Sequence, residues 1–429
     1  MRIVVVGLGK IGLPLAAQFA SKGHSVVGID INQNTVDSVN SAREPFPGEA
    51  GLREALEKFV PMGRLSATCN YKEAIPNCDV VVVVVPLLVD SGGQPDFGAL
   101  DSATRSIAGN LVSGTLICYE TTLPIGTTRN RWKPMLQEFS GLQEGVDFHL
   151  VFSPERVLTG RVFEDLRAYP KLFGALNKNG ALKAIEFYTS VSDFQPEGNS
   201  VRREAVIDLG STEAAEMAKL AETTYRDVNI ALANQFAQHA GNLGIDIYKV
   251  IEACNTQPYS HIHQPGISVG GHCIPVYPHL YLATHPEAHL VRQAREINVS
   301  MPEYAVKKLC QAMGGIVGQA IVVLGVSYRA GVKETAFSGV FSLVEELQAR
   351  GAQVSVLDPL FSDSELNGLG LLAHEDGLNT DCLVLHTDHP DFLELNHFDF
   401  PNVKMILDGR NFLMERDWPE VTILRLGAG

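Results

Sequence analysis

The sequence has no run of lysine and arginine, and its acidic residues outnumber its basic ones. It contains 34 Lys and Arg against 49 Asp and Glu, a formal net charge of −15 over 429 residues. Binding to nucleic-acid phosphates depends on clustered basic side chains, so we expect no nucleic-acid partner. Small anionic ligands remain compatible with this composition, because a few basic side chains or a helix N-terminus can meet their charge locally.

The sequence also lacks a long apolar run. The stretch VVVVVVPLLV at 80–89 is too short to cross a bilayer, which takes about 20 residues, and it suits a strand that is buried on both faces. Glycines and a lysine interrupt the apolar start MRIVVVGLGKIGLPLAAQFA, and no small-residue cleavage site follows. We therefore expect neither a membrane segment nor a signal peptide.

Paired cysteines are absent as well. The seven cysteines are scattered and none forms a CxxC pair, which is typical of reduced thiols rather than of a disulfide framework. We therefore expect a cytoplasmic protein. Histidines gather between 261 and 289, but the usual zinc patterns, HxxxH on a helix or paired CxxC, are missing. We predict no metal site.

Residues 2–30 carry a dinucleotide-binding pattern. A β-branched strand at 2–6 leads into GLGKIG at 7–12, a helix follows, and a second strand at 24–29 ends at Asp30. Gly7 permits a tight turn, Gly9 lets the backbone approach a pyrophosphate, and Gly12 lets the helix pack on the sheet. Asp30 can bind the ribose 2′-hydroxyl and would repel a 2′-phosphate. The predicted NAD site comprises Gly7, Gly9, Lys10, Ile11, Gly12 and Asp30.

Two further strands are expected at 78–86 and 115–128. Each ends in a polar or proline turn, as loops at the carboxyl edge of a parallel sheet do. Pro86, Thr121 and Thr122 on these turns are predicted to contact the cofactor. The two threonines could equally be ordinary turn hydroxyls.

From Ser211 the apolar spacing predicts one long helix, which Gly241 and Gly244 would end. Its length suits a connector between two lobes, and a dimer interface as well. Lys219 lies in an otherwise apolar part of this helix. A lysine in such a place could simply snorkel to the surface.

The stretch GGHCIPVYP at 270–278 sets Cys273 behind two glycines and a histidine and before two prolines. The glycines allow close backbone approach and the prolines fix the exit of the loop. A nearby ammonium such as Lys219 would raise the thiolate fraction of this cysteine. A lone cysteine is more often an inert core thiol, but this setting favours a nucleophile.

The C-terminal part predicts a second doubly wound sheet without the glycine pattern. Strands are expected at 320–328, 352–359, 382–388, 403–409 and 421–427, with a helix at 337–351. Arg329, Lys333 and Arg410 at its loop edge could bind a phosphate-bearing ligand or be plain surface charges. The predicted fold class is α/β, with two Rossmann-like doubly wound parallel sheets joined by a long central helix. We expect an NAD-binding domain at 1–205, a central helical and dimerisation domain with the cysteine loop at 206–300, and a nucleotide-sugar-binding domain at 301–429.

Over nearly its whole length the chain resembles the nucleotide-sugar 6-dehydrogenases, the UDP-glucose/GDP-mannose dehydrogenase family. The resemblance rests on GLGKIGLPLA at 7–16, ETTLPIGTT at 120–128, FSPERVLTG at 152–160, EMAKLAETTYRDVNIALAN at 216–234, GGHCIPV at 270–276 and LDGRN at 407–411. It implies a two-step, four-electron oxidation of a sugar 6-hydroxymethyl group to a carboxylate with two NAD, in a homodimer.

The resemblance also implies roles for single residues. Cys273 would trap the aldehyde as a thiohemiacetal that becomes a thioester, Lys219 would stabilise oxyanions, and Glu155 would handle water or protons. Thr223 stands near them on the long helix. The implied substrate-binding residues are Arg156, Gly270, Gly271, His272, Arg329 and Arg410.

Some positions depart from the family pattern. Thr223 replaces the usual asparagine and keeps one hydrogen-bond donor. Tyr277 replaces a family aspartate that helps to activate water or to orient the lysine, so hydrolysis of the thioester is either impaired or served by Glu155. Ala336 and Tyr259 stand where arginines are common.

The sequence GGHC, with HQPG at 263–266 before it, is similar to the branch that acts on UDP-N-acetylhexosamines such as UDP-ManNAc or UDP-GlcNAc. UDP-glucose or another nucleotide hexose is the alternative substrate. A non-catalytic nucleotide-sugar-binding relative would explain Thr223 and Tyr277 but not the presence of both Lys219 and Cys273. A hydroxyacid dehydrogenase of the 6-phosphogluconate type needs neither the cysteine nor the second sheet.

Overall fold

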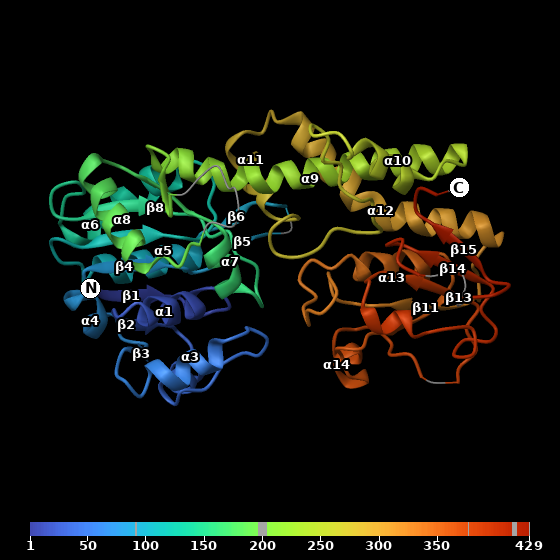
Figure 1. Cartoon of the computed structure of the whole chain (residues 1–429), viewed down its shortest axis with the longest axis horizontal. Helices are drawn as coiled ribbons and strands as arrows, with labels where there is room; N and C mark the ends of the chain where they lie inside the picture. The colour runs from blue at the N-terminus through green and yellow to red at the C-terminus, as the bar shows by residue number, and fades with distance from the viewer. Residues whose placement is uncertain (91, 196–203, 376, 414–417, 429) are drawn as a thin grey trace. The chain divides into compact units, whose positions relative to one another are not determined.

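The computed structural model describes residues 1–90, 92–195, 204–375, 377–413 and 418–428 (Figure 1). The chain divides into two compact units, each of which is described by itself. The first unit contains Met1–Ala221 and His279–Thr284, and the second contains Glu222–Pro278 and His285–Gly429.

The first unit is built on an eight-stranded sheet in the order β10-β9-β8-β7-β4-β1-β2-β3. Its central strands β4, β7 and β8 are mostly apolar and are buried throughout, as expected of strands covered on both faces. The strands are β1 (Arg2–Val6), β2 (Ser25–Ile29), β3 (Leu65–Thr68), β4 (Val80–Val83), β7 (Leu116–Tyr119), β8 (His149–Phe152), β9 (Lys171–Ala175) and β10 (Val206–Asp208). The sheet is parallel except that β9 runs antiparallel to β8, and β10 runs parallel to β9.

Helices cover this sheet and a short hairpin lies beside it. On one face α1 meets α8 through an edge-to-face contact of Phe19 with Phe187, whose ring centroids lie 5.6 Å apart. The helices are α1 (Gly12–Ser21), α2 (Gln33–Asn40), α3 (Leu52–Phe59), α4 (Tyr71–Ala74), η1 (Ile75–Asn77), α5 (Gly98–Ala108), η2 (Thr128–Trp132), α6 (Lys133–Ser140), α7 (Val162–Ala168) and α8 (Lys178–Val191). The hairpin pairs β5 (Leu88–Val89) with β6 (Pro95–Asp96), and α11 (Tyr277–Thr284) places His279 against its turn at Gly93.

The second unit contains a five-stranded, wholly parallel sheet in the order β12-β11-β13-β14-β15. Its strands are β11 (Ala320–Leu324), β12 (Gln353–Leu357), β13 (Cys382–Leu385), β14 (Met405–Asp408) and β15 (Thr422–Arg425). Its helices are α10 (Ile247–Cys254), α12 (His289–Met313), α13 (Val340–Ala349), α14 (Asp363–Gly368) and η3 (Pro390–Leu393).

The long helix α9 (Thr212–Leu243) runs from the first unit into the second. Within the second unit its Asp227 accepts hydrogen bonds from Arg295 Nη1 at 2.6 Å and Asn298 Nδ2 at 2.8 Å, both on α12. The prediction that Gly241 ends this helix is wrong, because Gly241 lies inside it. Gly244, with a φ of +71°, follows the last helical residue, as a left-handed residue at a helix C-terminus does.

The predicted α/β class, with two doubly wound sheets joined by a long helix, is confirmed. The strands are shorter than expected. The strand predicted at 115–128 ends at Tyr119, and the one at 78–86 covers only Val80–Val83. The residues beyond these ends form the turns at the carboxyl edge of the sheet, where the predicted cofactor residues lie.

Candidate active site

The glycine turn after β1 has the geometry that a dinucleotide needs. Gly7 has a φ of +94°, and its N–H donates to the Ile29 carbonyl at 2.8 Å. A Cβ on Gly12 would lie 1.9 Å from the Gly7 oxygen, whereas one on Gly9 would meet nothing within 4 Å. Gly7 and Gly12 are therefore needed for close packing, and Gly9 leaves open space beside the backbone. Ile11, the N-cap of α1, supplies no side-chain cap, so this helix end is suited to a phosphate.

Asp30 follows β2 and is held across this turn. Its Oδ2 accepts the Leu8 N–H at 2.9 Å and its Oδ1 accepts the Asn32 N–H at 2.9 Å. Each carboxylate oxygen can accept a further hydrogen bond, so a ribose diol can still be bound. Tyr71 on α4 is a neighbour that the sequence did not single out. Burial, and then the charge of Asp30, raises the pKa of Tyr71 to about 12.

The remaining predicted cofactor residues lie on the same turns of the first unit. Thr121 Oγ1 donates to the Val85 carbonyl at 2.6 Å, which ties the turn after β7 to the turn after β4. Thr122 is buried, whereas Pro86 and Lys10 are exposed. The open Gly9 backbone, the uncapped helix end and the Asp30 carboxylate together fit NAD.

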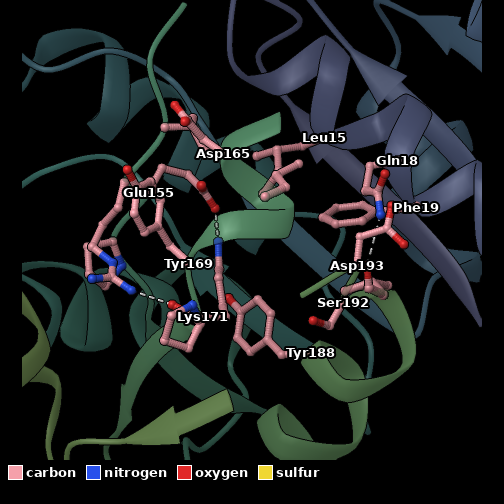
Figure 2. Close-up of a pocket in the computed structure, with 16 residues that line it drawn as sticks. Leu15, Gln18, Phe19, Glu155, Asp165, Tyr169, Lys171, Tyr188, Ser192 and Asp193 are labelled. Carbon is pink, nitrogen blue, oxygen red and sulfur yellow. Dashed lines mark hydrogen bonds and ion pairs between the residues drawn. The ribbon is translucent and has the colours of Figure 1, made fainter. Parts of the chain in front are cut away.

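Glu155 and Arg156 lie in the loop after β8 and line a pocket of the first unit. Figure 2 shows the Lys171 side chain pointing toward Glu155, with which it forms an ion pair. Lys171 Nζ also lies 3.0 Å from Oε2 of Glu120, and Tyr188 donates to Oε1 of Glu120 at 2.7 Å. The Arg156 guanidinium donates to the Pro170 carbonyl. The sequence predicted roles for Glu155 and Arg156 and gave no signal for their neighbours Lys171 and Glu120.

Lys219 and Thr223 are both buried and lie one turn apart on α9. Glu216, nearly one turn before Lys219, was also missed. Its carboxylate accepts the Thr128 N–H at 2.9 Å and the Thr128 hydroxyl at 2.7 Å, and the Gly126 N–H as well. Burial outweighs these hydrogen bonds and raises the pKa of Glu216 to about 7. This contact fixes α9 to the segment that follows Thr121 and Thr122.

The cysteine loop of the second unit packs on the loop after β11. A Cβ on Gly270 would lie 2.5 Å from Tyr328 Cβ, and one on Gly271 would lie 3.0 Å from the Tyr328 ring. The Gly271 N–H donates to the Ala336 carbonyl at 3.0 Å. Two glycines are therefore required by the chain's own Tyr328. The Cys273 carbonyl accepts the Tyr277 N–H at 2.9 Å. Cys273 itself is partly exposed.

His272 points outward from this loop. Its side chain is exposed, its Nε2 lies 3.8 Å from Oε2 of Glu334, and its ring meets Phe337 edge-on. Lys333, from the same region after β11, pairs with Glu365 at 2.6 Å. Arg329 lies four positions before Lys333 in the sequence and is half-buried.

Arg410 follows β14 and is held by backbone oxygens. Its Nε donates to the His386 carbonyl at 2.7 Å and its Nη1 to the Ser268 carbonyl at 3.4 Å. The His386 ring lies 2.9 Å from the Ser268 hydroxyl. Burial, and then the charge of Arg410, lowers the pKa of His386 to about 3, so this histidine is neutral at physiological pH.

The two units thus hold different parts of the predicted site. The first contains Gly7, Gly9, Lys10, Ile11, Gly12, Asp30, Pro86, Thr121, Thr122, Glu155, Arg156 and Lys219, and the second contains Thr223, Gly270, Gly271, His272, Cys273, Arg329 and Arg410. Within the described ranges, no group of three or more His, Cys, Asp or Glu side chains is placed to hold a metal ion. None of the helices described is long and apolar enough to span a membrane.

One sheet carries a glycine turn with an acidic residue beside it, and the edge of the second sheet carries basic side chains. Together these features define a dinucleotide-dependent enzyme with a separate ligand-binding unit. Family models give the class directly. Residues 1–192 match the NAD binding domain, 213–300 the central domain and 322–415 the UDP binding domain of the UDP-glucose/GDP-mannose dehydrogenase family. The chain belongs to this family.

Relatives match the chain from end to end. It is 36% identical to a UDP-N-acetyl-D-mannosamine dehydrogenase of Pyrococcus horikoshii, over 100% of this chain and 99% of the relative. It is 33% identical to an NDP-N-acetyl-D-galactosaminuronic acid dehydrogenase of Ralstonia nicotianae, over 95% of each. A solved structure of a UDP-D-ManNAc dehydrogenase from Pyrococcus horikoshii aligns with a TM-score of 0.90 at 34% identity, over 100% of both chains. The protein is therefore an NAD-dependent nucleotide-sugar dehydrogenase.

Proposed function

We propose that the protein oxidises the C6 hydroxymethyl group of UDP-N-acetyl-D-mannosamine to a carboxylate, with Cys273 as the nucleophile. The observation that carries the choice of sugar is the full-length similarity to the UDP-N-acetyl-D-mannosamine dehydrogenase of Pyrococcus horikoshii. The glycine-framed loop of Cys273 supports a covalent route, because its backbone is fixed against Tyr328 while the thiol stays partly exposed.

The proposed reaction has two oxidations and one hydrolysis. When bound, NAD would supply the hydride acceptor for each oxidation, and the hydroxyl proton would pass to a base. Cys273 Sγ adds to the aldehyde carbon between them, so the intermediate stays attached and the second oxidation yields a thioester. The Lys219 ammonium stabilises the negative oxygen that forms in these steps, and Thr223 donates a hydrogen bond. Glu155 takes the proton of the water that releases the carboxylic acid.

The second unit supplies the proposed nucleotide-sugar contacts. Arg329 and Arg410 are basic groups at the carboxyl edge of its sheet, where ligands of open α/β sheets bind, and they would meet the diphosphate. Gly270, Gly271 and His272 form the backbone and side-chain surface beside the reacting carbon. In the first unit, Arg156 lies next to Glu155 and would contact the sugar.

We further propose three parts for the chain, at 1–205, 206–300 and 301–429, and a cytoplasmic homodimer. Seven free cysteines support the compartment. An apolar stripe on α9 supports the dimer, because Tyr225, Leu232, Phe236 and Leu243 recur at helical spacing and expose 40–59% of their surface. The occupant proposed for this stripe is the same helix of a second copy.

The sugar is tested by comparing kcat/KM for UDP-N-acetyl-D-mannosamine, UDP-N-acetyl-D-glucosamine, UDP-N-acetyl-D-galactosamine, UDP-glucose and GDP-mannose. We expect the first to be preferred by roughly 10-fold or more, since a misplaced or missing hydroxyl or acetamido group leaves buried polar groups unpaired. A preference for the galactosamine sugar would instead favour the activity named for the Ralstonia nicotianae relative.

A further inference from the structure

Lys171 is a half-buried lysine of the first unit that the mechanism above does not use. It opens β9, and its side chain is only 15% exposed. Its ammonium lies 3.0 Å from Oε2 of Glu120 and also pairs with Glu155, the contact that Figure 2 shows. An ammonium removed from water must be paired, and here two carboxylates share it.

Glu120 is the fixed member of this cluster. It follows β7, its side chain is fully buried, and Tyr188 donates to its second oxygen at 2.7 Å. Tyr188 is itself buried and packs against Phe173 and Phe187, with ring centroids 6.1 Å and 4.8 Å away. Because Glu120 and Tyr188 are enclosed by the core, they hold the Lys171 ammonium at one place on the sheet edge.

Glu155 is the member that faces the pocket. It lies in the loop after β8, its side chain is 10% exposed, and it lines the space shown in Figure 2. The ammonium therefore contacts both an enclosed carboxylate and one that lines the pocket. An adjacent positive charge favours the ionised form of a carboxyl group, and only the ionised form can accept a proton from water.

We propose that Lys171 is a positioning residue for Glu155: anchored by Glu120, its ammonium holds the Glu155 carboxylate ionised and in place to take a proton from water. This inference rests on the proposed role of Glu155. In that step the water oxygen bonds to the thioester carbon, the carbon–sulfur bond breaks, and the water proton passes to Glu155. The Cys273 thiolate leaves and recovers a proton, so no electrons are transferred.

Other ionisable groups line the same pocket as Glu155. They come from its own loop, from α7, from the segment before β9, from α8 and from the segment after α8. These groups are Arg156, Asp165, Tyr169, Tyr188 and Asp193. All stay in place in the variants below, so their contribution to the pH profile is the same in each.

The inference is tested on the full-length enzyme by stopping the reaction after the two oxidations and measuring the acyl group on Cys273 by intact-protein mass spectrometry. In Lys171→Met we expect acyl-enzyme to accumulate and its hydrolysis to slow by roughly 10–100-fold, a part of what a general base contributes. Lys171→Arg should restore most of the rate. Lys183→Met, an exposed lysine of α8, should match the wild type.

The pH profile separates positioning from damage to the fold. Without Lys171, Glu155 binds a proton at higher pH, so the acid limb of the pH profile for hydrolysis should shift to higher pH. In Glu120→Gln the ammonium pairs with Glu155 alone, so the same limb should shift to lower pH. A purely structural role would slow both variants without opposite shifts. If Lys171→Met does not fold, Glu120→Gln and Lys171→Arg still give this readout.

A double variant distinguishes failure of the inference from failure of the proposed function. In a Glu155→Gln background, Lys171→Met should change hydrolysis less than 2-fold, because the group it positions is gone. If Glu155→Gln accumulates acyl-enzyme but Lys171→Met does not, the positioning role is wrong and the role of Glu155 stands. If Glu155→Gln hydrolyses at the wild-type rate, both are wrong.

Discussion

At the scale of single residues, we propose that Asp30 governs the choice of cofactor. Its oxygens are oriented by the Leu8 and Asn32 N–H groups and remain able to accept from a ribose diol. We expect Asp30→Asn to raise the KM for NAD roughly 10–100-fold, the effect of losing a hydrogen bond to a charged group. Initial-rate kinetics with NAD and NADP measure this. Asp37→Asn, on the exposed side of α2, is the matched control, and an unchanged KM in Asp30→Asn would contradict the assignment.

The same residues show how far sequence reasoning reaches. The spacing of Gly7, Gly9, Gly12 and Asp30 predicted their places correctly, because each role is local to one turn. The glycines before Cys273 were found, but the side chain that requires them was not. Tyr328 lies 58 and 57 positions away from Gly270 and Gly271, so no local pattern could connect them. Lys171 and Glu120 were missed for the same reason.

At the scale of elements, Glu216 joins α9 to the segment after β7. Burial raises its pKa to about 7, from an ordinary value of 4.5 that the unfolded chain keeps. Between these values the folded state holds a proton that the unfolded state has lost, so stability falls as pH rises from about 4.5 to about 7. The shift corresponds to about 3 kcal/mol of unfolding free energy.

Urea unfolding of wild type and Glu216→Gln at pH 5 and pH 8 checks this. The wild type should lose stability relative to the variant as pH rises, because glutamine carries no charge at either pH. Glu186→Gln, exposed on α8, should run parallel to the wild type. If the difference in unfolding free energy between wild type and Glu216→Gln is the same at pH 5 and pH 8, Glu216 is ionised at both pH values and the prediction is wrong.

The elements themselves were largely predictable. Each strand that we predicted from a short β-branched run between turns is present in the structure, and so are α9 and α13, which we predicted from helical spacing. The reversal of β9 and β10 relative to β8 was not foreseen, since strand direction depends on pairing across the sheet and not on local composition. The prediction that Gly241 ends α9 was wrong for a related reason. A glycine can continue a helix when the surrounding contacts outweigh its low helix propensity.

At the scale of the whole molecule, the exposed stripe on α9 predicts self-association. Replacing Leu232 and Phe236 together by glutamate puts charges where a second copy would bury apolar surface, and we expect a dimer to become a monomer. Sedimentation equilibrium should then give the chain mass of 46.6 kDa instead of twice that value. Phe398→Glu, an exposed aromatic residue outside α9, should leave the dimer intact. A wild type that sediments as one chain would contradict the proposal.

The central claim is that one active site carries out two oxidations with the intermediate held on Cys273. The most direct test is the number of NADH molecules formed per molecule of UDP-N-acetyl-D-mannosamine consumed, run to completion in wild type and in Cys273→Ala. We expect two NADH per sugar in the wild type and at most one in Cys273→Ala, because no thioester can form without the thiol. One NADH per sugar in the wild type, or two in Cys273→Ala, would contradict it.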